Sequence, residues 1–238
     1  MIVITGVGRS GTSFVAQVYR ELGFDPGGKW LASVNAGFED DEVVSANELV
    51  AHDLGLLFLG GPRPAPPGSA GGGLLASLKA RGRPASPDQF DTIEPSRLQP
   101  AVDRHRDQLR RVAASHPVVK DPRFCWTMPV WLLAGASIDH VVLSTRAMDA
   151  VIASRRAAGH LRYRTEAAAT NELIYALGVC FAALSEHDVP HSVVRFPHIL
   201  DCPEQLAATL PFPSPVAPDR IAEAVRSVAR RDLVHDWR

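Results

Sequence analysis

The sequence has few cysteines and no long hydrophobic run, and each shortage excludes a class of protein. Its three cysteines, Cys125, Cys180 and Cys202, include no CxxC pair. A scattered, odd set of this kind is typical of reduced thiols in a cytosolic protein, and it argues against a disulfide framework or a cysteine-rich zinc site. The first residues, Met-Ile-Val-Ile, are not a charged leader, and no apolar run approaches the ~20 residues of a membrane span. The sequence therefore predicts a cytoplasmic protein without a membrane span.

The sequence also has no large excess of positive or negative charge, because the formal net charge at pH 7 is -1. A chain that wraps nucleic acid or binds an anionic membrane needs a large positive surface, so both functions are disfavoured. Lysine is scarce, since Lys29, Lys79 and Lys120 are the only lysines among 25 basic residues. Arginine carries the remaining positive charge, and its planar guanidinium suits bidentate recognition of phosphate and sulfate. We therefore expect local anion binding and no nucleic-acid partner.

Short apolar segments alternate with helical patterns along the chain, and 46% of the residues are hydrophobic. We expect strands at 2–5, 117–119, 138–144 and 191–196, and helices at 14–22, 41–58, 95–115, 165–187, 203–210 and 218–233, with one more helix ending at residue 156. Strands that alternate with helices form a parallel sheet covered on both faces. The sequence thus predicts an α/β fold: a three-layer, P-loop-like fold with a central parallel sheet flanked by helices.

The length of 238 residues suits a single domain, residues 1–238, with a variable insertion at about 59–96. Within that insertion, the segment 60–73 consists mainly of glycine and proline and cannot support regular structure. It is either a mobile cover over an acceptor pocket or a passive, solvated linker. The sequence leaves both interpretations open.

A glycine-rich segment, G-x4-G-T-S, runs from Gly6 to Ser13 after the first expected strand. Glycines let backbone N–H groups converge on an anion at a helix N-terminus, where the helix dipole also favours negative charge. A loop that binds nucleoside triphosphates carries a lysine at the position that Thr12 occupies here. A different cation, Arg9, lies inside the loop. The pattern favours an anion site over a simple strand–helix turn, and the missing lysine argues against a triphosphate.

The segment Arg9-Ser10-Gly11-Thr12 resembles the 5′-phosphosulfate-binding loop of sulfotransferases that use 3′-phosphoadenosine 5′-phosphosulfate (PAPS). That family has a second signature, an arginine at the end of a strand and a serine eight residues later, which hold the 3′-phosphate. Arg146 and Ser154 are similar to this pair in type, order and spacing. The resemblance implies that the 5′-phosphosulfate is held by Arg9, Ser10, Gly11, Thr12 and Ser13, and the 3′-phosphate by Arg146 and Ser154.

Three other segments are similar to bacterial members of this family. They are the Gly-Phe-Glu segment that ends at Glu39, the strand that ends in Lys120-Asp121-Pro122-Arg123, and the late segment 193–204. The resemblance spans about residues 2–210 and implies that Lys120 lies near the transferring group. For a third nucleotide contact, late in the family's chain, the pair Arg230-Arg231 is a candidate.

Sulfuryl transfer requires cations and a base. Negative charge builds on the leaving phosphate oxygen, and preorganised cations such as Arg9 and Lys120 stabilise it. Because sulfuryl transfer involves less charge than phosphoryl transfer, we expect no metal ion to be required. The acceptor hydroxyl also needs a general base within hydrogen-bond reach. Many family members use a histidine where this chain has Pro122, so the role passes to Glu39, to Asp121 or to a histidine from elsewhere. We favour Glu39, although a carboxylate there also suits a helix N-terminus.

Together the motifs predict a cytoplasmic sulfotransferase that moves a sulfuryl group from PAPS, its co-substrate, to a hydroxyl of a small-molecule or carbohydrate acceptor. An amine is the less favoured acceptor, and 3′-phosphoadenosine 5′-phosphate (PAP) is the product. Two alternatives stay open: a P-loop small-molecule or nucleotide kinase, and a catalytically silent nucleotide-binding module. The absent loop lysine and the pair Arg146/Ser154 weigh against the kinase. The sequence contains no code for the acceptor's identity or for the oligomeric state.

Overall fold

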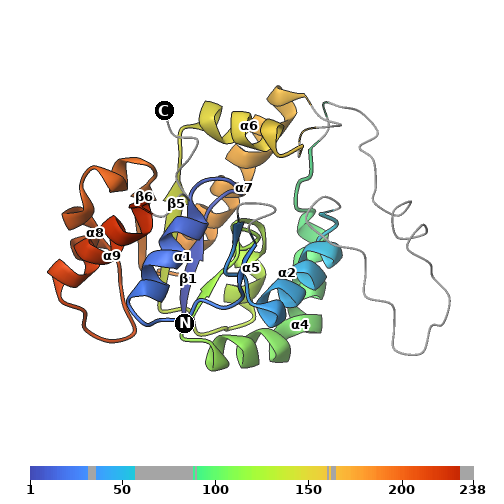
Figure 1. Cartoon of the computed structure of the whole chain (residues 1–238). Helices are drawn as coiled ribbons and strands as arrows, with labels where there is room; N and C mark the ends of the chain where they lie inside the picture. Colours follow the sequence, from blue (N-terminus) through green and yellow to red (C-terminus); the bar gives the residue numbers. More distant parts are fainter. Residues whose placement is uncertain (32–35, 57–87, 89, 160, 162–164, 231–238) are drawn as a thin grey trace, which may run out of the picture.

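A computed structural model describes the protein apart from residues 32–35, 57–87, 89, 160, 162–164 and 231–238 (Figure 1). Its main sheet has four parallel strands, β1 (Ile2–Thr5), β4 (Val118–Lys120), β5 (His140–Thr145) and β6 (His191–Arg195), in the order β4-β1-β5-β6. In this register Ile4 of β1 lies between Lys120 and Val142. A separate antiparallel pair is formed by β2 (Trp30–Leu31) and β3 (Ala36–Gly37). The strands β1, β4 and β5 lead into the segments that matter for the site.

Side chains alternate across the sheet and give each face its own core. Ile2 and Ile4 pack into the core that includes α1 (Thr12–Glu21), α8 (Pro203–Thr209) and α9 (Pro218–Arg230). Val3 faces the other way, into the core that includes α2 (Asp41–Asp53), α4 (Pro95–Ser115), α5 (Phe124–Leu133), α6 (Met148–Ala157) and α7 (Glu166–Glu186). The predicted α/β fold, with a central parallel sheet flanked by helices, is therefore confirmed.

One predicted helix ends earlier in the structure, and one helix of the structure is not predicted. The helix expected at 41–58 ends at Asp53, because Gly55 adopts a left-handed φ of 81° and the N–H of Leu56 donates to the Ala51 carbonyl at 2.9 Å. Leu56 is buried beyond the helix end, so its apolar character reflects the core and not helical periodicity. Helix α5 is not predicted from the sequence, because it is almost entirely apolar and includes Pro129.

Connections from adjacent strands run to opposite faces of the sheet. β1 leads through the glycine-rich loop into α1 on one face, whereas β4 and β5 lead into α5 and α6 on the other. In open parallel sheets, ligands bind beyond the carboxyl ends of the strands, where connections diverge in this way. Here that edge carries the loop 6–11, the segment 121–123 and Arg146. The topology thus gathers three widely separated segments at one place.

Helix α7 is 21 residues long, and its length and composition would also suit a membrane span. This differs from the expectation that no apolar segment approaches that length. Ala169, Leu173 and Cys180 on one side of the helix are buried in the core that α7 shares with α5. Core helices of soluble proteins pass the same test of length and composition, so this helix alone is weak support for a membrane location.

Candidate functional site

The glycine-rich loop is packed so tightly that two of its glycines have no room for a side chain. Gly6 and Gly11 have φ angles of 152° and 98°, which favour glycine. A Cβ at Gly6 would lie 2.2 Å from the Ser144 carbonyl oxygen, and one at Gly11 would lie 2.5 Å from Cγ of Phe196. Gly8 differs, because a Cβ there would meet no atom within 4 Å. The loop therefore presses against β5 and Phe196, while its backbone at Gly8 stays open.

Helix α1 begins at this loop without a side-chain cap. Gly11 is the N-cap residue, and the first turn contains no acidic residue. The N–H groups of Thr12 and Ser13 belong to the first turn, where a helix offers no acceptor for them. The side chain of Thr12 is buried, whereas Ser13 is half-buried. The uncapped turn offers backbone donors and the positive end of the helix dipole to an anion.

The side chain of Ser10 is fully buried at the base of the loop. Its N–H donates to the Val7 carbonyl at 3.1 Å, and its own carbonyl accepts from Oγ of Ser144 at 2.8 Å. Its Oγ has no hydrogen-bond partner among the residues that the structure describes. The bond from the Ser144 hydroxyl fastens the loop to β5, and the bond to Val7 closes a turn within the loop. A direct contact between the Ser10 hydroxyl and a phosphosulfate requires that hydroxyl to turn outward, so this role stays a prediction.

Arg9 connects the loop to helix α6. Its backbone has a left-handed φ of 77°, and its Nε donates to Oγ of Ser154 at 2.9 Å. Arg146 follows β5 directly, is half-buried and leads into the same helix. Figure 1 shows α6 lying across the upper end of α1, at the carboxyl edge of the sheet. The structure therefore brings Arg9 of the first motif into contact with Ser154 of the second, across a separation of 145 residues.

A second group of charged residues lies at the end of β4. Lys120 is only 1% exposed, and its Nζ donates to the Gly37 carbonyl at 3.0 Å and to Oε1 of Glu39 at 2.7 Å. The other carboxylate oxygen of Glu39 lies 3.4 Å from Nη1 of Arg123. The Glu39 side chain is 27% exposed, so solvent or a ligand can reach it. Glu39 is thus a carboxylate held between two cations, and the N-cap of α2 is its neighbour Asp40.

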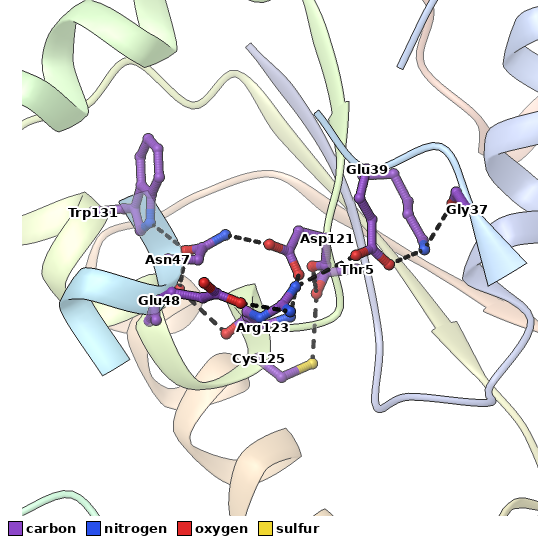
Figure 2. Close-up of polar contacts among 11 residues, drawn as sticks. Thr5, Gly37, Glu39, Asn47, Glu48, Asp121, Arg123, Cys125 and Trp131 are labelled. Atoms are coloured by element: carbon purple, nitrogen blue, oxygen red, sulfur yellow. Dashed lines mark hydrogen bonds and ion pairs between the residues drawn. The ribbon is translucent and has the colours of Figure 1, made fainter. Parts of the chain in front are cut away.

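Arg123 joins Glu39 to two more carboxylates (Figure 2). Its Nη1 lies 3.1 Å from Oδ1 of Asp121, and its Nη2 lies 3.1 Å from Oε1 of Glu48. Asp121 also accepts the backbone N–H of Arg123 at 2.8 Å. Burial raises the pKa of the Asp121 carboxyl, although the charge of Arg123 opposes the shift. Asp121 therefore has a structural partner in Arg123.

Asn47 is a buried amide for which sequence reasoning gives no role. Its Nδ2 donates to Oδ2 of Asp121 at 3.0 Å, and its Oδ1 accepts from Thr127 at 2.6 Å and from the indole N–H of Trp131 at 2.9 Å. Figure 2 shows the contacts running from Trp131 through Asn47 to Asp121 and Arg123. The available signal is a polar residue among the buried apolar residues of α2. Buried polar networks of this kind hold side chains in one arrangement when every member is satisfied.

The two groups offer different chemistry. The loop side presents the N-terminus of α1 with Arg9 and Arg146, which suits an anionic ligand. On the β4 side, Glu39 can accept a proton once Lys120 or Arg123 gives up one of its contacts. Asp121 is the less accessible candidate base, because it is fully buried and bonded to Asn47 and Arg123. Of these two candidate bases, Glu39 is therefore the more accessible.

Some predicted features lie outside the described residues. They are most of the insertion at about 59–96, Arg231 and the side chain of Arg230. In the part of the chain that is described, no group of three or more histidine, cysteine, aspartate or glutamate side chains is arranged to hold a metal ion.

Comparisons of the chain with protein-family models, with curated proteins and with solved structures gave no match.

Proposed function

We propose that this chain is a PAPS-dependent sulfotransferase of P-loop-like topology that transfers a sulfuryl group to a hydroxyl, or less favourably an amine, of a small molecule or carbohydrate. The observation that carries the proposal is the 2.9 Å hydrogen bond from Arg9 to Ser154. It joins the loop proposed for the 5′-phosphosulfate to the helix proposed for the 3′-phosphate. A single nucleotide with anionic groups at both ends of its ribose matches that arrangement.

The residues present fit such a donor. The uncapped N-terminus of α1, the open backbone at Gly8 and the guanidinium of Arg9 would take the 5′-phosphosulfate. Arg146 and Ser154 would take the 3′-phosphate. ATP fits less well, because a triphosphate loop needs a lysine at the position of Thr12, whose side chain is buried here.

Lys120 would stabilise the negative charge that develops on the leaving phosphate. An ammonium group has three N–H donors, and two of them are directed at Gly37 and Glu39. The third can serve the bridging oxygen of the donor. The register of the sheet supports this placement, because Lys120 lies beside Ile4, two residues before the loop begins.

Glu39 would take the proton of the acceptor hydroxyl. The acceptor oxygen then forms a bond to sulfur while the bond from sulfur to the phosphate oxygen breaks, and the leaving phosphate carries the negative charge away as PAP. The 2.7 Å contact between Glu39 and Lys120 links the two events. As Lys120 moves toward the developing charge, Oε1 of Glu39 becomes available for the proton.

Calorimetric titration separates this proposal from its alternatives. Tight binding of PAP, with no binding of ATP–magnesium, and sulfuryl transfer from PAPS to a member of an acceptor panel support a sulfotransferase. Binding of ATP–magnesium in preference to PAP would instead identify a kinase. Binding of PAP without turnover across a broad panel of alcohols, phenols, amines and glycans would identify a silent nucleotide-binding module.

A further inference from the structure

Arg155 is a mostly buried arginine whose hydrogen-bonding capacity is left unused. Its side chain is 18% exposed, and its Nη2 lies 3.5 Å from Oε1 of Glu172, across the contact between α6 and α7. Charge-assisted hydrogen bonds between such groups normally measure ~2.7–2.9 Å. In the described structure, its Nε and Nη1 are buried and have no hydrogen-bond partner at all. The ion pair with Glu172 is therefore long and engages one of the three guanidinium nitrogens.

A buried guanidinium with two unbonded nitrogens costs folding free energy, which a residue with only a structural role would not be expected to do. Desolvation lowers the pKa of Arg155, which shows that its surroundings compensate the buried charge poorly. Arg123 provides the contrast within the same protein, because both of its terminal nitrogens contact carboxylates. Folded proteins satisfy nearly all buried polar groups, and an exception requires an explanation such as a ligand. Little free energy is lost when Arg155 leaves this position for a better partner.

The position of Arg155 relates it to the proposed reaction site. Its neighbour Ser154 accepts the hydrogen bond from Arg9 of the loop, whereas Arg155 extends toward α7. Consecutive residues on a helix point in directions about 100° apart. Arg155 therefore lies beside the proposed nucleotide contacts but outside that set. A molecule that approaches the loop along the junction of α6 and α7 would meet it.

We propose that Arg155 binds an oxyanion of the acceptor, a carboxylate, sulfate or phosphate ester, and so selects anionic acceptors. Glu172 holds the guanidinium through Nη2 until the acceptor arrives, and the side chain then moves out of this position so that its N–H groups receive the oxyanion. Because Arg155 and Glu172 together carry no net charge, a free anion binds weakly, and an anion attached to an acceptor binds better. The acceptor part of this inference rests on the proposed sulfotransferase function, whereas the anion site itself does not.

The anion site is tested by thermal unfolding in inorganic phosphate at constant ionic strength, with saturating PAP to occupy the loop and Arg146. Wild type is compared with Arg155→Gln and with Arg156→Gln, whose exposed arginine pairs with Glu166 at the surface. We expect phosphate to raise the melting temperature of wild type and Arg156→Gln. In Arg155→Gln the apparent affinity should fall roughly tenfold or more, as for the loss of a charged hydrogen-bonding partner. Equal responses of all three proteins, or no response in any, would overturn the site.

A fold defect is distinguished by the unfolding curves without phosphate. A structural arginine would lower the melting temperature when replaced, whereas an arginine kept for binding leaves it unchanged or raises it, since a poorly compensated charge is removed. Arg155→Lys keeps the positive charge but lacks the paired N–H donors of the guanidinium, so phosphate should raise its melting temperature by only part of the wild-type increase. If PAP does not bind, the sulfotransferase proposal fails, but the phosphate comparison in nucleotide-free protein still decides the role of Arg155.

The acceptor part is tested with matched phenols, 4-hydroxybenzoate and its methyl ester. Wild type should show a lower KM for the carboxylate, and Arg155→Gln should lose that preference while kcat with the ester stays the same. A phosphate site that depends on Arg155, combined with equal KM values for the two phenols in wild type, would identify a free anion as the ligand and overturn the acceptor assignment.

Discussion

Replacement of Glu39 by glutamine removes a negative charge between Lys120 and Arg123 and preserves the shape of the side chain. The 2.7 Å contact with Lys120 then loses its counter-charge on a lysine that is 1% exposed. Breaking a fully buried ion pair costs ~3–5 kcal/mol. Glu39 is 27% exposed, so solvent recovers part of that loss. We expect the free energy of unfolding to fall by about 1–3 kcal/mol.

The effect on turnover should be much larger than the effect on donor binding. Removal of a general base lowers rates by roughly 10²–10⁴-fold. The dissociation constant of PAP should change by less than about threefold, since Glu39 is proposed to contact no phosphate itself and its partner Lys120 is proposed to act on charge that develops during transfer. Turnover is measured by sulfuryl transfer from PAPS, and PAP binding by calorimetry. Glu48→Gln is the matched control, because Glu48 is 30% exposed and contacts the same guanidinium at 3.1 Å.

The stability cost of the unpaired lysine is separable from the loss of the base. The double variant Glu39→Gln/Lys120→Leu removes both charges, so it should recover most of the lost stability, although its turnover also lacks the proposed contribution of Lys120. Near-normal turnover of Glu39→Gln alone would refute the assignment and move the base to Asp121 or to a histidine. If Glu48→Gln lowered turnover as much as Glu39→Gln, the loss would be due to the changed charge around Arg123 and not to the loss of a proton acceptor.

Four other outcomes follow from the site. Arg146→Gln should weaken PAP binding roughly 10- to 100-fold and leave AMP binding nearly unchanged in calorimetry; equal losses would contradict a 3′-phosphate contact. Asn47→Leu leaves the indole N–H of Trp131 without its acceptor and removes a hydrogen-bond donor to Asp121, so the free energy of unfolding in urea should fall by about 2–5 kcal/mol. A fall of less than about 1 kcal/mol would contradict the network. Because burial raises the pKa of folded Asp121, the folded state binds more protons than the unfolded chain above pH ~4, and stability should fall as pH rises through that window. Asp121→Asn should flatten this slope in pH-dependent unfolding, and an unchanged slope would contradict the assignment. Turnover should survive treatment with EDTA, whereas a loss that magnesium reverses would show that a metal is required.

The four strands of the parallel sheet and the glycine-rich loop could be predicted from the sequence because their signals are local, whereas the two-residue strands β2 and β3 could not. Ile2 to Thr5 is a short apolar, β-branched run that is followed by a glycine. The loop motif consists of consecutive residues, so it can be recognised without knowledge of the tertiary structure. Helix α5 could not be predicted in the same way, because a helix that is apolar on nearly every side has no periodicity to reveal it. The end of α2 at Asp53 could not be predicted, because Leu54 and Leu56 follow the helix and are buried in the core.

The partners of the site residues depend on packing, which local patterns do not contain. Glu39 and Lys120 are separated by 81 residues, and only the meeting of β3 with the end of β4 makes them an ion pair. The same holds for Asn47, whose amide becomes significant because Asp121 and Trp131 lie opposite it in the core. The charged side chains of the site could be identified from the sequence. Which of them form ion pairs and hydrogen bonds with one another depends on the tertiary structure.

The contact between Gly11 and Phe196 makes the loop dependent on a distant part of the chain. Phe196 follows β6, an edge strand of the sheet, and its ring occupies the space that a Cβ at Gly11 would need. Edge strands are held by hydrogen bonds on one side only and open more readily than inner strands. Fraying of β6 would withdraw Phe196 and release the start of α1. Amide exchange in the loop should therefore follow the opening of β6. The affinity of the loop for an anion would then depend on whether β6 is paired with β5.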